Sequence, residues 1–181
     1  MIELWPVVPD DERWQWTLEP FAGVGPLRFG MSPGETVEAM KNITADAEPH
    51  RHYHPAPWSV RGSEDGRYLD FGLRLYYWQE QLAAVIVDAL CGPQVYADGA
   101  ALVARVPSTL ERWMLDRAPA HEPDGTVTYM GGGLACSESL GVVINVQRAG
   151  DHLLTRPMLL STEAFDGGSY FLPEDTWEIQ R

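Results

Sequence analysis

The sequence predicts a single α+β domain in which two short helices accompany a largely antiparallel sheet. Three observations lead to this fold class. The chain has 181 residues, the usual length of one domain. Hydrophobic residues make up 45% of it, enough to build a core, and its 17 glycines and 14 prolines indicate many turns. Segments typical of helices and strands follow one another in the order helix, strands, helix, strands.

A capping box predicts the first helix. Ser32 is followed by Pro33 at the first helical position and by Glu35 three residues after the cap, which is a typical helix start. We expect this helix over residues 33–42. The glycine-containing segment 23–31 predicts a tight strand or turn that leads the chain into it, with Gly30 in a conformation of positive φ or at a close contact.

A loop and two strands are expected next. Residues 48–57 are rich in proline and histidine and predict a loop. Residues 73–78 alternate in a period of two, which is the pattern of a strand with one buried face. Residues 82–88 form an apolar run that fits a central strand, and a short hairpin loop at 79–81 joins the two.

The second half of the chain predicts another helix and three strands. A second capping box, Ser108 with Glu111, predicts a helix of about nine residues that begins there. Residues 126–129, 140–147 and 153–160 predict strands, and a turn at 148–151 joins the last two. We find no shift in composition along the chain, so all of residues 1–181 are assigned to the same domain.

The net charge narrows the classes of partner. Thirteen basic and 26 acidic residues give the chain a formal net charge of −13 at pH 7, with a pI near 4.6. Proteins that track phosphates release counterions with Lys and Arg, so the charge argues against nucleic acid. A basic protein is the better expectation. The start of the chain lacks the pattern of a secretory signal, and its longest apolar stretch is too short to cross a bilayer, so we expect a cytoplasmic protein with no membrane partner.

The C-terminal part, 163–181, is expected to be an acidic and aromatic extension of the domain. Aromatic anchors within an acidic rim are typical of a binding hot spot for a basic protein. The alternative is a solvated extension that its aromatics dock onto the domain. The acidic residues are Glu163, Asp166, Glu174, Asp175 and Glu178, and the aromatic ones are Phe165, Tyr170, Phe171 and Trp177.

A second candidate surface follows from the strand at 73–78. Arg74, Tyr76 and Trp78 share the face opposite Leu73 and its alternate neighbours. Either a second layer of the fold covers that face or the face binds a partner.

Three alternate histidines are the candidate metal ligands. His50, His52 and His54 would point the same way in an extended segment, and three imidazoles can ligate zinc and leave a position open for an activated water. This pattern supports an alternative function as a metal-binding protein or metal-dependent hydrolase. The opposing interpretation is a solvated polar loop.

The sequence lacks the motifs of other common nucleotide-binding and catalytic sites. The glycines at 23–30 match neither a P-loop nor a dinucleotide-binding loop, and Ser139 is not in a nucleophile elbow. Cys91 and Cys136 form no disulfide framework, and we expect two reduced thiols.

Two resemblances bear on function. The segment 25–32, Gly-Pro-Leu-Arg-Phe-Gly-Met-Ser, resembles the Leu-x-x-Gly-Met-Ser signature that precedes a helix in BamE-like α+β modules. Segments 25–40 and 73–108, with Ala-Ala-Val-Ile-Val-Asp-Ala and Cys-Gly-Pro-Gln-Val, resemble small acidic bacterial proteins that include immunity proteins of polymorphic toxin systems. This second resemblance implies a cytoplasmic binder of a toxin domain and supplies no catalytic residue.

Together these observations predict a non-enzymatic protein-binding module, most concretely an immunity protein that neutralises a basic toxin domain. No cofactor is expected, and zinc belongs only to the alternative based on the histidines.

Overall fold

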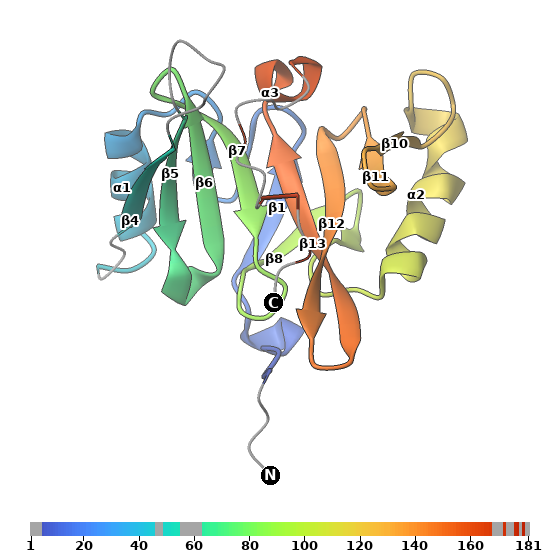
Figure 1. Ribbon diagram of the computed structural model, residues 1–181, viewed down its shortest axis with the longest axis horizontal. Coiled ribbons are helices and arrows are strands. Elements are labelled where there is room, and N and C mark those ends of the chain that lie inside the picture. The colour runs from blue at the N-terminus through green and yellow to red at the C-terminus, as the bar shows by residue number, and fades with distance from the viewer. Residues whose placement is uncertain are drawn as a thin grey trace.

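The computed structural model consists of two sheets with the main hydrophobic core between them (Figure 1). The structure describes residues 5–45, 49–54, 63–167, 172, 176, 177 and 179, and for 50–54 and 63–65 it describes the backbone. Within these residues the chain is an α+β domain with mostly antiparallel sheets, as the sequence predicts.

The larger sheet has eight strands, paired antiparallel throughout. The sequence-distant strands β7 and β13 meet at its centre, where Leu159 pairs with Val85. In spatial order the strands are β10 (Thr128–Met130), β11 (Leu134–Ser137), β12 (Val142–Ala149), β13 (His152–Leu160), β7 (Gln81–Val87), β6 (Leu73–Trp78), β5 (Ser63–Tyr68) and β4 (His50–His54).

The smaller sheet lies behind the larger one in Figure 1. Its strands β1 and β8 run parallel, with Trp16 opposite Val95, while its other described pairs are antiparallel. In order the strands are β3 (Leu27–Arg28), β2 (Gly23–Val24), β1 (Gln15–Glu19), β8 (Gln94–Ala97) and β9 (Ala100–Ala101).

Helices flank the two sheets. Helix α1 (Pro33–Lys41) lies at one side, α2 (Pro107–His121) lies at the other, and α3 (Thr162–Asp166) lies at one end of β13 (Figure 1). Two short 3-10 turns, η1 (Asp10–Glu12) and η2 (Leu69–Phe71), complete the described elements. No described helix has the length and apolar character needed to span a membrane.

The capping box of α1 is confirmed. Ser32 Oγ accepts a hydrogen bond from the Glu35 backbone N–H at 3.3 Å, and the Glu35 carboxylate accepts one from the Ser32 N–H at 2.8 Å. Gly30, with φ of +89°, redirects the chain before the cap, and its N–H donates to the Leu82 carbonyl at 2.9 Å. The entry to α1 is therefore fixed to the central strand β7.

Both faces of the larger sheet are buried at its central strands β6, β7 and β13. Leu75 and Val85 belong to the core between the sheets, whereas Tyr76, Ala84 and Ile86 belong to a second cluster on the outer face. This second cluster includes Leu172, and Phe165 and Trp177 pack against it. Burial on both faces explains why β7 is apolar at nearly every position.

Several sequence predictions of structure hold with small shifts of their boundaries. Strands β6, β7, β12 and β13 occur where the pattern predicts them, and Gln79 and Glu80 form the turn of the β6–β7 hairpin. Their φ angles of +51° and +62° fit a two-residue hairpin turn.

Other predictions are wrong. Residues 48–57 do not form only a loop, because 50–54 are strand β4, paired with β5. Ser108 does not cap α2: the helix begins at Pro107 after Val106, which gives no side-chain cap, and it runs for 15 residues through Pro119. Proline at the first helical position determines this start, because its missing N–H costs nothing there. Helix α3 and strand β11 lie outside the elements that the sequence predicts.

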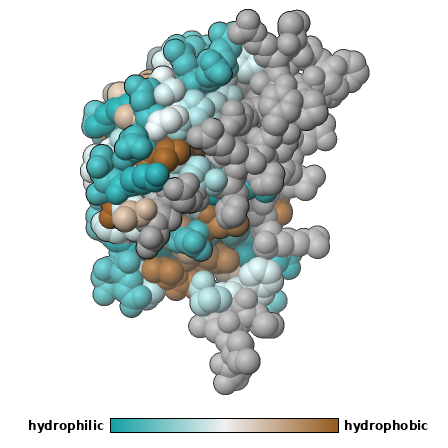
Figure 2. All heavy atoms as spheres, turned by 90° about the vertical axis from the view of Figure 1, so that its left-hand side faces the viewer, coloured by the Kyte–Doolittle hydropathy of each residue, from teal (hydrophilic) through white to brown (hydrophobic). Residues whose placement is uncertain are grey.

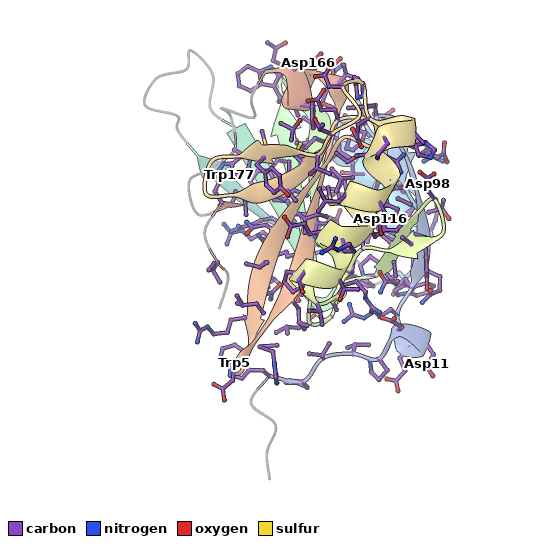
Figure 3. The ribbon with its side chains drawn as sticks, turned by 90° about the vertical axis from the view of Figure 1, so that its right-hand side faces the viewer. Trp5, Asp11, Asp98, Asp116, Asp166 and Trp177 are labelled. Atoms are coloured by element: carbon purple, nitrogen blue, oxygen red, sulfur yellow. The ribbon has the colours of Figure 1, made fainter. Side chains whose placement is uncertain are left out.

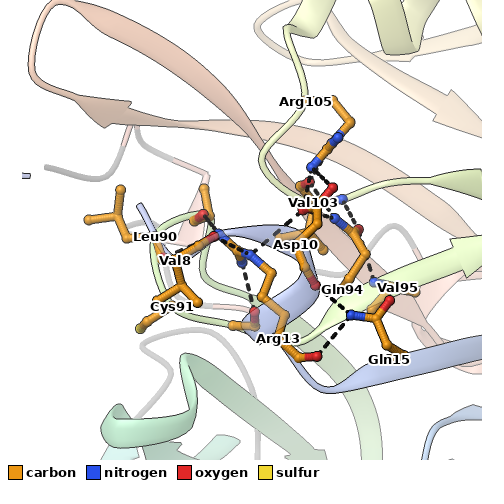
Figure 4. Close-up of polar contacts among 12 residues, drawn as sticks. Val8, Asp10, Arg13, Gln15, Leu90, Cys91, Gln94, Val95, Val103 and Arg105 are labelled. Carbon is orange, nitrogen blue, oxygen red and sulfur yellow. Dashed lines mark hydrogen bonds and ion pairs between the residues drawn. The ribbon is translucent and has the colours of Figure 1, made fainter. Parts of the chain in front are cut away.

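Arg13 connects the N-terminal segment to the loop after β7 (Figure 4). Its guanidinium donates to the carbonyls of Val8 at 2.8 Å, Gly92 at 2.7 Å, and Ala89 and Leu90 at 2.7 and 3.2 Å. Its side chain is fully buried. A single charged group thus satisfies four backbone acceptors, which makes it a structural clamp.

Asp10 extends this network toward the loop before α2. Its carboxylate accepts two hydrogen bonds from Arg105, at 2.6 and 2.7 Å, and one from Gln94 at 2.9 Å. Burial alone would raise the pKa of Asp10, but these hydrogen bonds and the two arginines outweigh burial and lower it.

Candidate partner-binding site

A pocket with three aromatic walls lies where α3 meets the β6–β7 turn. Its volume is about 200 Å³, and four separate segments of the chain build it. We call it the aromatic pocket. Its lining residues are Phe21, Phe29, Gly30, Trp78, Gln81, Leu82, Ala83, Ser161, Thr162 and Glu163.

The β6–β7 hairpin supplies one wall. Trp78 is the last residue of β6 and pairs with Gln81 across the turn. Its half-buried ring packs against the outer core cluster, so the indole is supported from behind and open to the pocket.

Phe21 supplies a second wall from a tight turn. Its φ of +58° is uncommon for a residue with a bulky side chain and costs roughly 1–3 kcal/mol. The ring of Phe21 lies against Gly141, where an added Cβ would be 2.7 Å from Phe21 Cε1. It also meets Phe165 of α3. These contacts hold Phe21 in place before any ligand arrives.

The start of α3 brings a carboxylate to the pocket. The Ser161 N–H donates to the Ala83 carbonyl at 2.8 Å, and Ser161 Oγ accepts from the Ala164 N–H at 3.2 Å. These bonds fix the first turn of α3 to β7. Glu163 in that turn is exposed and lines the pocket, and Asp166, also exposed, lies one helical turn further along.

The electrostatics of the pocket favour a cation. None of its lining residues, all of which lie in the described part of the chain, is basic, and Glu163 is acidic. Exposed Glu80 neighbours the lining residue Gln81. Aromatic faces attract a cation and also accommodate an apolar stem. A lysine or arginine side chain presents both features, so its chemistry matches the pocket.

The side of the molecule that carries α1 has both hydrophilic and hydrophobic surface. Figure 2 shows the side that carries α1: hydrophilic residues dominate the upper part of the described surface, and hydrophobic patches lie lower down.

The structure brings together only some of the residues that the sequence singles out. Trp78 and Glu163 line the same pocket, and Asp166 lies on the same helix. Trp177 packs on the outer face of the larger sheet, well away from Asp166 in Figure 3. The remaining candidates of the C-terminal extension, which lie outside the described residues, are Tyr170, Phe171, Glu174, Asp175 and Glu178.

Arg74 and Tyr76 do not reach the aromatic pocket. Tyr76 is fully buried, and its hydroxyl lies 2.9 Å from Thr176 Oγ1 in a hydrogen bond. Its side chain therefore contributes to the core of the outer face, so of the two alternatives for Tyr76 the covered face holds and the partner-binding one does not. Arg74 lies over the Tyr76 ring at 5.8 Å and lines a different pocket.

The three histidines lie at alternate positions of β4. In the strand register His50 pairs with Arg67, His52 with Asp65 and His54 with Ser63. The structure describes only the backbone of residues 50–54. Among the described residues no cluster of three or more His, Cys, Asp or Glu side chains is arranged to hold a metal ion.

The cysteines are poor nucleophiles. Burial raises the pKa of the Cys136 thiol to about 12, and burial together with Asp88 raises that of Cys91 to about 11. Both thiols therefore stay protonated near neutral pH and lack the reactive thiolate.

A buried carboxylate at the end of α2 has a structural role. Glu122 accepts hydrogen bonds from the hydroxyls of Ser137 and Ser139, from the Ser139 N–H at 2.9 Å and from Arg117 at 3.1 Å. Arg117 also pairs with Asp98 at 2.7 Å. In Figure 3, Asp116 lies on α2 and Asp98 lies beside this helix. This network ties α2 to the turn between β11 and β12.

Sequence reasoning missed Phe21 and Phe29. Phe29 precedes Gly30 in the segment read as a strand or turn, and Phe21 follows Pro20 in an irregular turn. Neither position lies in a periodic pattern that would mark it. The pocket is built from four segments that only the folded chain brings together.

Comparison with family models, curated proteins and solved structures found no match to this chain.

Proposed function

We propose that the protein is a non-enzymatic binding module for a basic protein, most concretely an immunity protein that neutralises a basic toxin domain in the cytoplasm. The aromatic pocket is the observation that carries this proposal. It combines the walls of Phe21, Phe29 and Trp78 with the carboxylate of Glu163 on a chain of net charge −13.

The proposed mode of binding has two parts. The negative charge of the whole chain attracts a basic domain over long range and raises the association rate. An arginine or lysine of that domain then enters the aromatic pocket, where its stem packs on the rings and its charged end pairs with Glu163. If the toxin has a cleft that binds nucleic acid, Glu163 and the other surface carboxylates of the chain would block the basic side chains that bind phosphate there.

Pre-organisation supports this proposal. Phe21 is held by Gly141 and Phe165, Trp78 by the outer cluster, and Glu163 by the capped first turn of α3. A partner would therefore spend little free energy on ordering these walls.

Co-expression with the protein encoded by the neighbouring gene tests this function. We expect that protein to inhibit growth when expressed alone, and we expect wild-type chain to restore growth and co-purify with it in stoichiometric amount. A harmless neighbour of metabolic function that does not bind the chain would contradict the proposal.

A further inference from the structure

The aromatic pocket has the composition of a site for a small organic cation, a ligand that the proposed function does not include. Its walls carry the rings of Phe21, Phe29 and Trp78, and Glu163 is the charged residue among the described lining residues. Its volume of about 200 Å³ lies below the roughly 300–1,000 Å³ of sites that hold a drug-sized ligand. The pocket therefore suits a headgroup of a few carbon atoms.

Backbone groups in the pocket wall are already hydrogen-bonded within the fold. The Leu82 carbonyl accepts from the Gly30 N–H at 2.9 Å, and the Leu82 N–H donates to the Met31 carbonyl at 2.7 Å. The Ala83 carbonyl accepts from the Ser161 N–H at 2.8 Å. A primary ammonium or a guanidinium that left water for the interior of this pocket would satisfy its N–H donors less completely, which costs free energy.

A quaternary ammonium avoids this cost because its nitrogen carries four carbon substituents and no N–H. Its positive charge reaches the surrounding methyl groups, which contact aromatic faces directly. Cation–π attraction is strongest over an indole, which Trp78 supplies at the end of β6, and Phe21 and Phe29 add two further rings. The walls therefore match a quaternary ammonium more closely than a primary amine.

The charges around the pocket disfavour an anionic group on the ligand. No described lining residue is basic, and Glu163 would repel a carboxylate or a phosphate. Arg28 precedes Phe29 in the chain, but its guanidinium pairs with Glu19 at 2.8 Å. A cation without an anionic substituent, such as choline, therefore fits better than a betaine.

We propose that the aromatic pocket binds a small quaternary ammonium cation of the choline class. The trimethylammonium group lies among the three rings, and exposed Glu163 balances its charge. This inference rests on the pocket and not on the neutralisation of a toxin domain, so the two proposals can fail separately. Where both hold, the cation competes with the basic side chain of the protein partner for the same pocket.

Isothermal titration calorimetry on the chain alone, near neutral pH and at constant ionic strength, tests this site with four probes. Choline is compared with ethanolamine, its primary-ammonium counterpart, and with 3,3-dimethylbutan-1-ol, its neutral carbon isostere. Glycine betaine carries the same trimethylammonium group beside a carboxylate. We expect saturable binding of one choline per chain and binding of the other three probes that is weaker by about tenfold or more.

Substitutions in the walls test whether choline binds at this pocket. Trp78→Leu keeps an apolar side chain but removes the indole, and it should weaken choline binding by about tenfold or more. Trp14→Leu is the matched control, because Trp14 is an exposed tryptophan outside the pocket, and it should leave the affinity unchanged. Phe29→Leu should weaken binding severalfold, and it replaces Trp78→Leu if circular dichroism shows that variant to be unfolded.

The outcomes are distinct. Choline that binds no more tightly than its neutral isostere, or no more tightly than ethanolamine, would overturn the proposal. Equal losses in Trp78→Leu and Trp14→Leu, or absence of saturable choline binding, would also overturn it. A chain that binds no choline and still restores growth in the co-expression experiment would contradict this inference and leave the proposed function in place.

Discussion

Phe21 and Phe165 meet edge to face, with ring centroids 5.9 Å apart and ring planes at 89°. The contact joins the turn that follows β1 to helix α3, two segments far apart in the sequence. It also positions one wall of the aromatic pocket relative to Glu163, which lines the same pocket from α3. The local backbone strain at Phe21 is thus coupled to the geometry of the proposed site.

Replacing Phe21 separates the contribution of its ring from that of its backbone. We expect Phe21→Ala to lower the free energy of unfolding by about 2–4 kcal/mol, because a half-buried ring is lost while the φ of +58° remains unfavourable. Phe21→Gly loses the same ring but adopts this φ readily, so it should be at least as stable as the alanine variant. Urea denaturation measures the free energy of unfolding of both variants. A glycine variant clearly less stable than the alanine variant would contradict a strained Phe21.

Arg13 should be among the most sensitive positions for stability. Arg13→Ala leaves the carbonyls of Val8, Ala89, Leu90 and Gly92 without their buried donor, and we expect a loss of about 3–5 kcal/mol. The exposed Arg112→Ala serves as the matched control and should change stability by less than about 0.5 kcal/mol. Thermal unfolding measures the stability of the two variants. Similar losses of stability in both would contradict the role of Arg13 as a structural clamp.

Acid should destabilise the protein in part through Glu122. Burial alone would raise the pKa of this carboxyl, but hydrogen bonds from Ser137 and Ser139 and the charge of Arg117 outweigh burial and lower it below its ordinary 4.5. The folded state therefore binds this proton less tightly than the unfolded state. The resulting stability is fully present above pH 4.5 and is lost as the pH falls through the lower folded value.

The variant Glu122→Gln removes this titration. Its stability at neutral pH should be below that of wild type, and its decline between about pH 6 and pH 3 should be shallower. Denaturant unfolding at a series of pH values measures both slopes. Parallel curves for the two proteins would show that Glu122 contributes nothing to the acid sensitivity.

The aromatic pocket predicts which tryptophan matters for binding the toxin domain. Trp78→Ala should weaken the complex by roughly 2 kcal/mol, about thirtyfold in Kd, as expected for the centre of a hot spot. Trp14→Ala removes a tryptophan that is 52% exposed and outside the pocket, and it should leave the affinity unchanged. Surface plasmon resonance on the two variants checks this, and equal losses would place the interface elsewhere.

The charge of the chain predicts a strong salt dependence of association. Because the Debye length shortens from about 30 Å at 0.01 M to about 8 Å at 0.15 M salt, the association rate with a basic domain should fall steeply over this range. The dissociation rate should change far less. Stopped-flow fluorescence measures the association rate directly. An association rate that stays constant between these salt concentrations would show that electrostatic steering does not contribute to binding.

Local signals predicted much of the fold. The capping box at Ser32 specifies the start of α1 because its partners are three residues apart, and the apolar run at 82–87 marks a strand buried on both faces. The same reasoning failed at Ser108, where Pro107 sets the helix start instead. It also failed at 50–54, where pairing with β5 stabilises a strand that the local composition does not favour.

The candidate site was less predictable than the fold. Trp78 and Glu163 were singled out for their composition, but only the pairing of β7 with β13 and the capping of α3 bring them to one pocket. A second pocket, lined by Arg67, Arg74 and Arg156, shows the same limit, since these residues come from three strands whose register the sequence does not specify. The sequence left open whether Tyr76 is covered, because its hydrogen-bond partner Thr176 lies one hundred residues away.

Nuclear magnetic resonance of the tryptophan indole N–H groups tests the central claim, that the aromatic pocket accepts a cationic side chain. On titration with N-acetyl-arginine amide, we predict that the Trp78 signal shifts saturably. Glu163→Gln should weaken this binding about fivefold, while Glu12→Gln, an exposed acid outside the pocket, should leave it unchanged. A Trp78 signal that does not move, or that moves equally with uncharged N-acetyl-glutamine amide, would contradict the account.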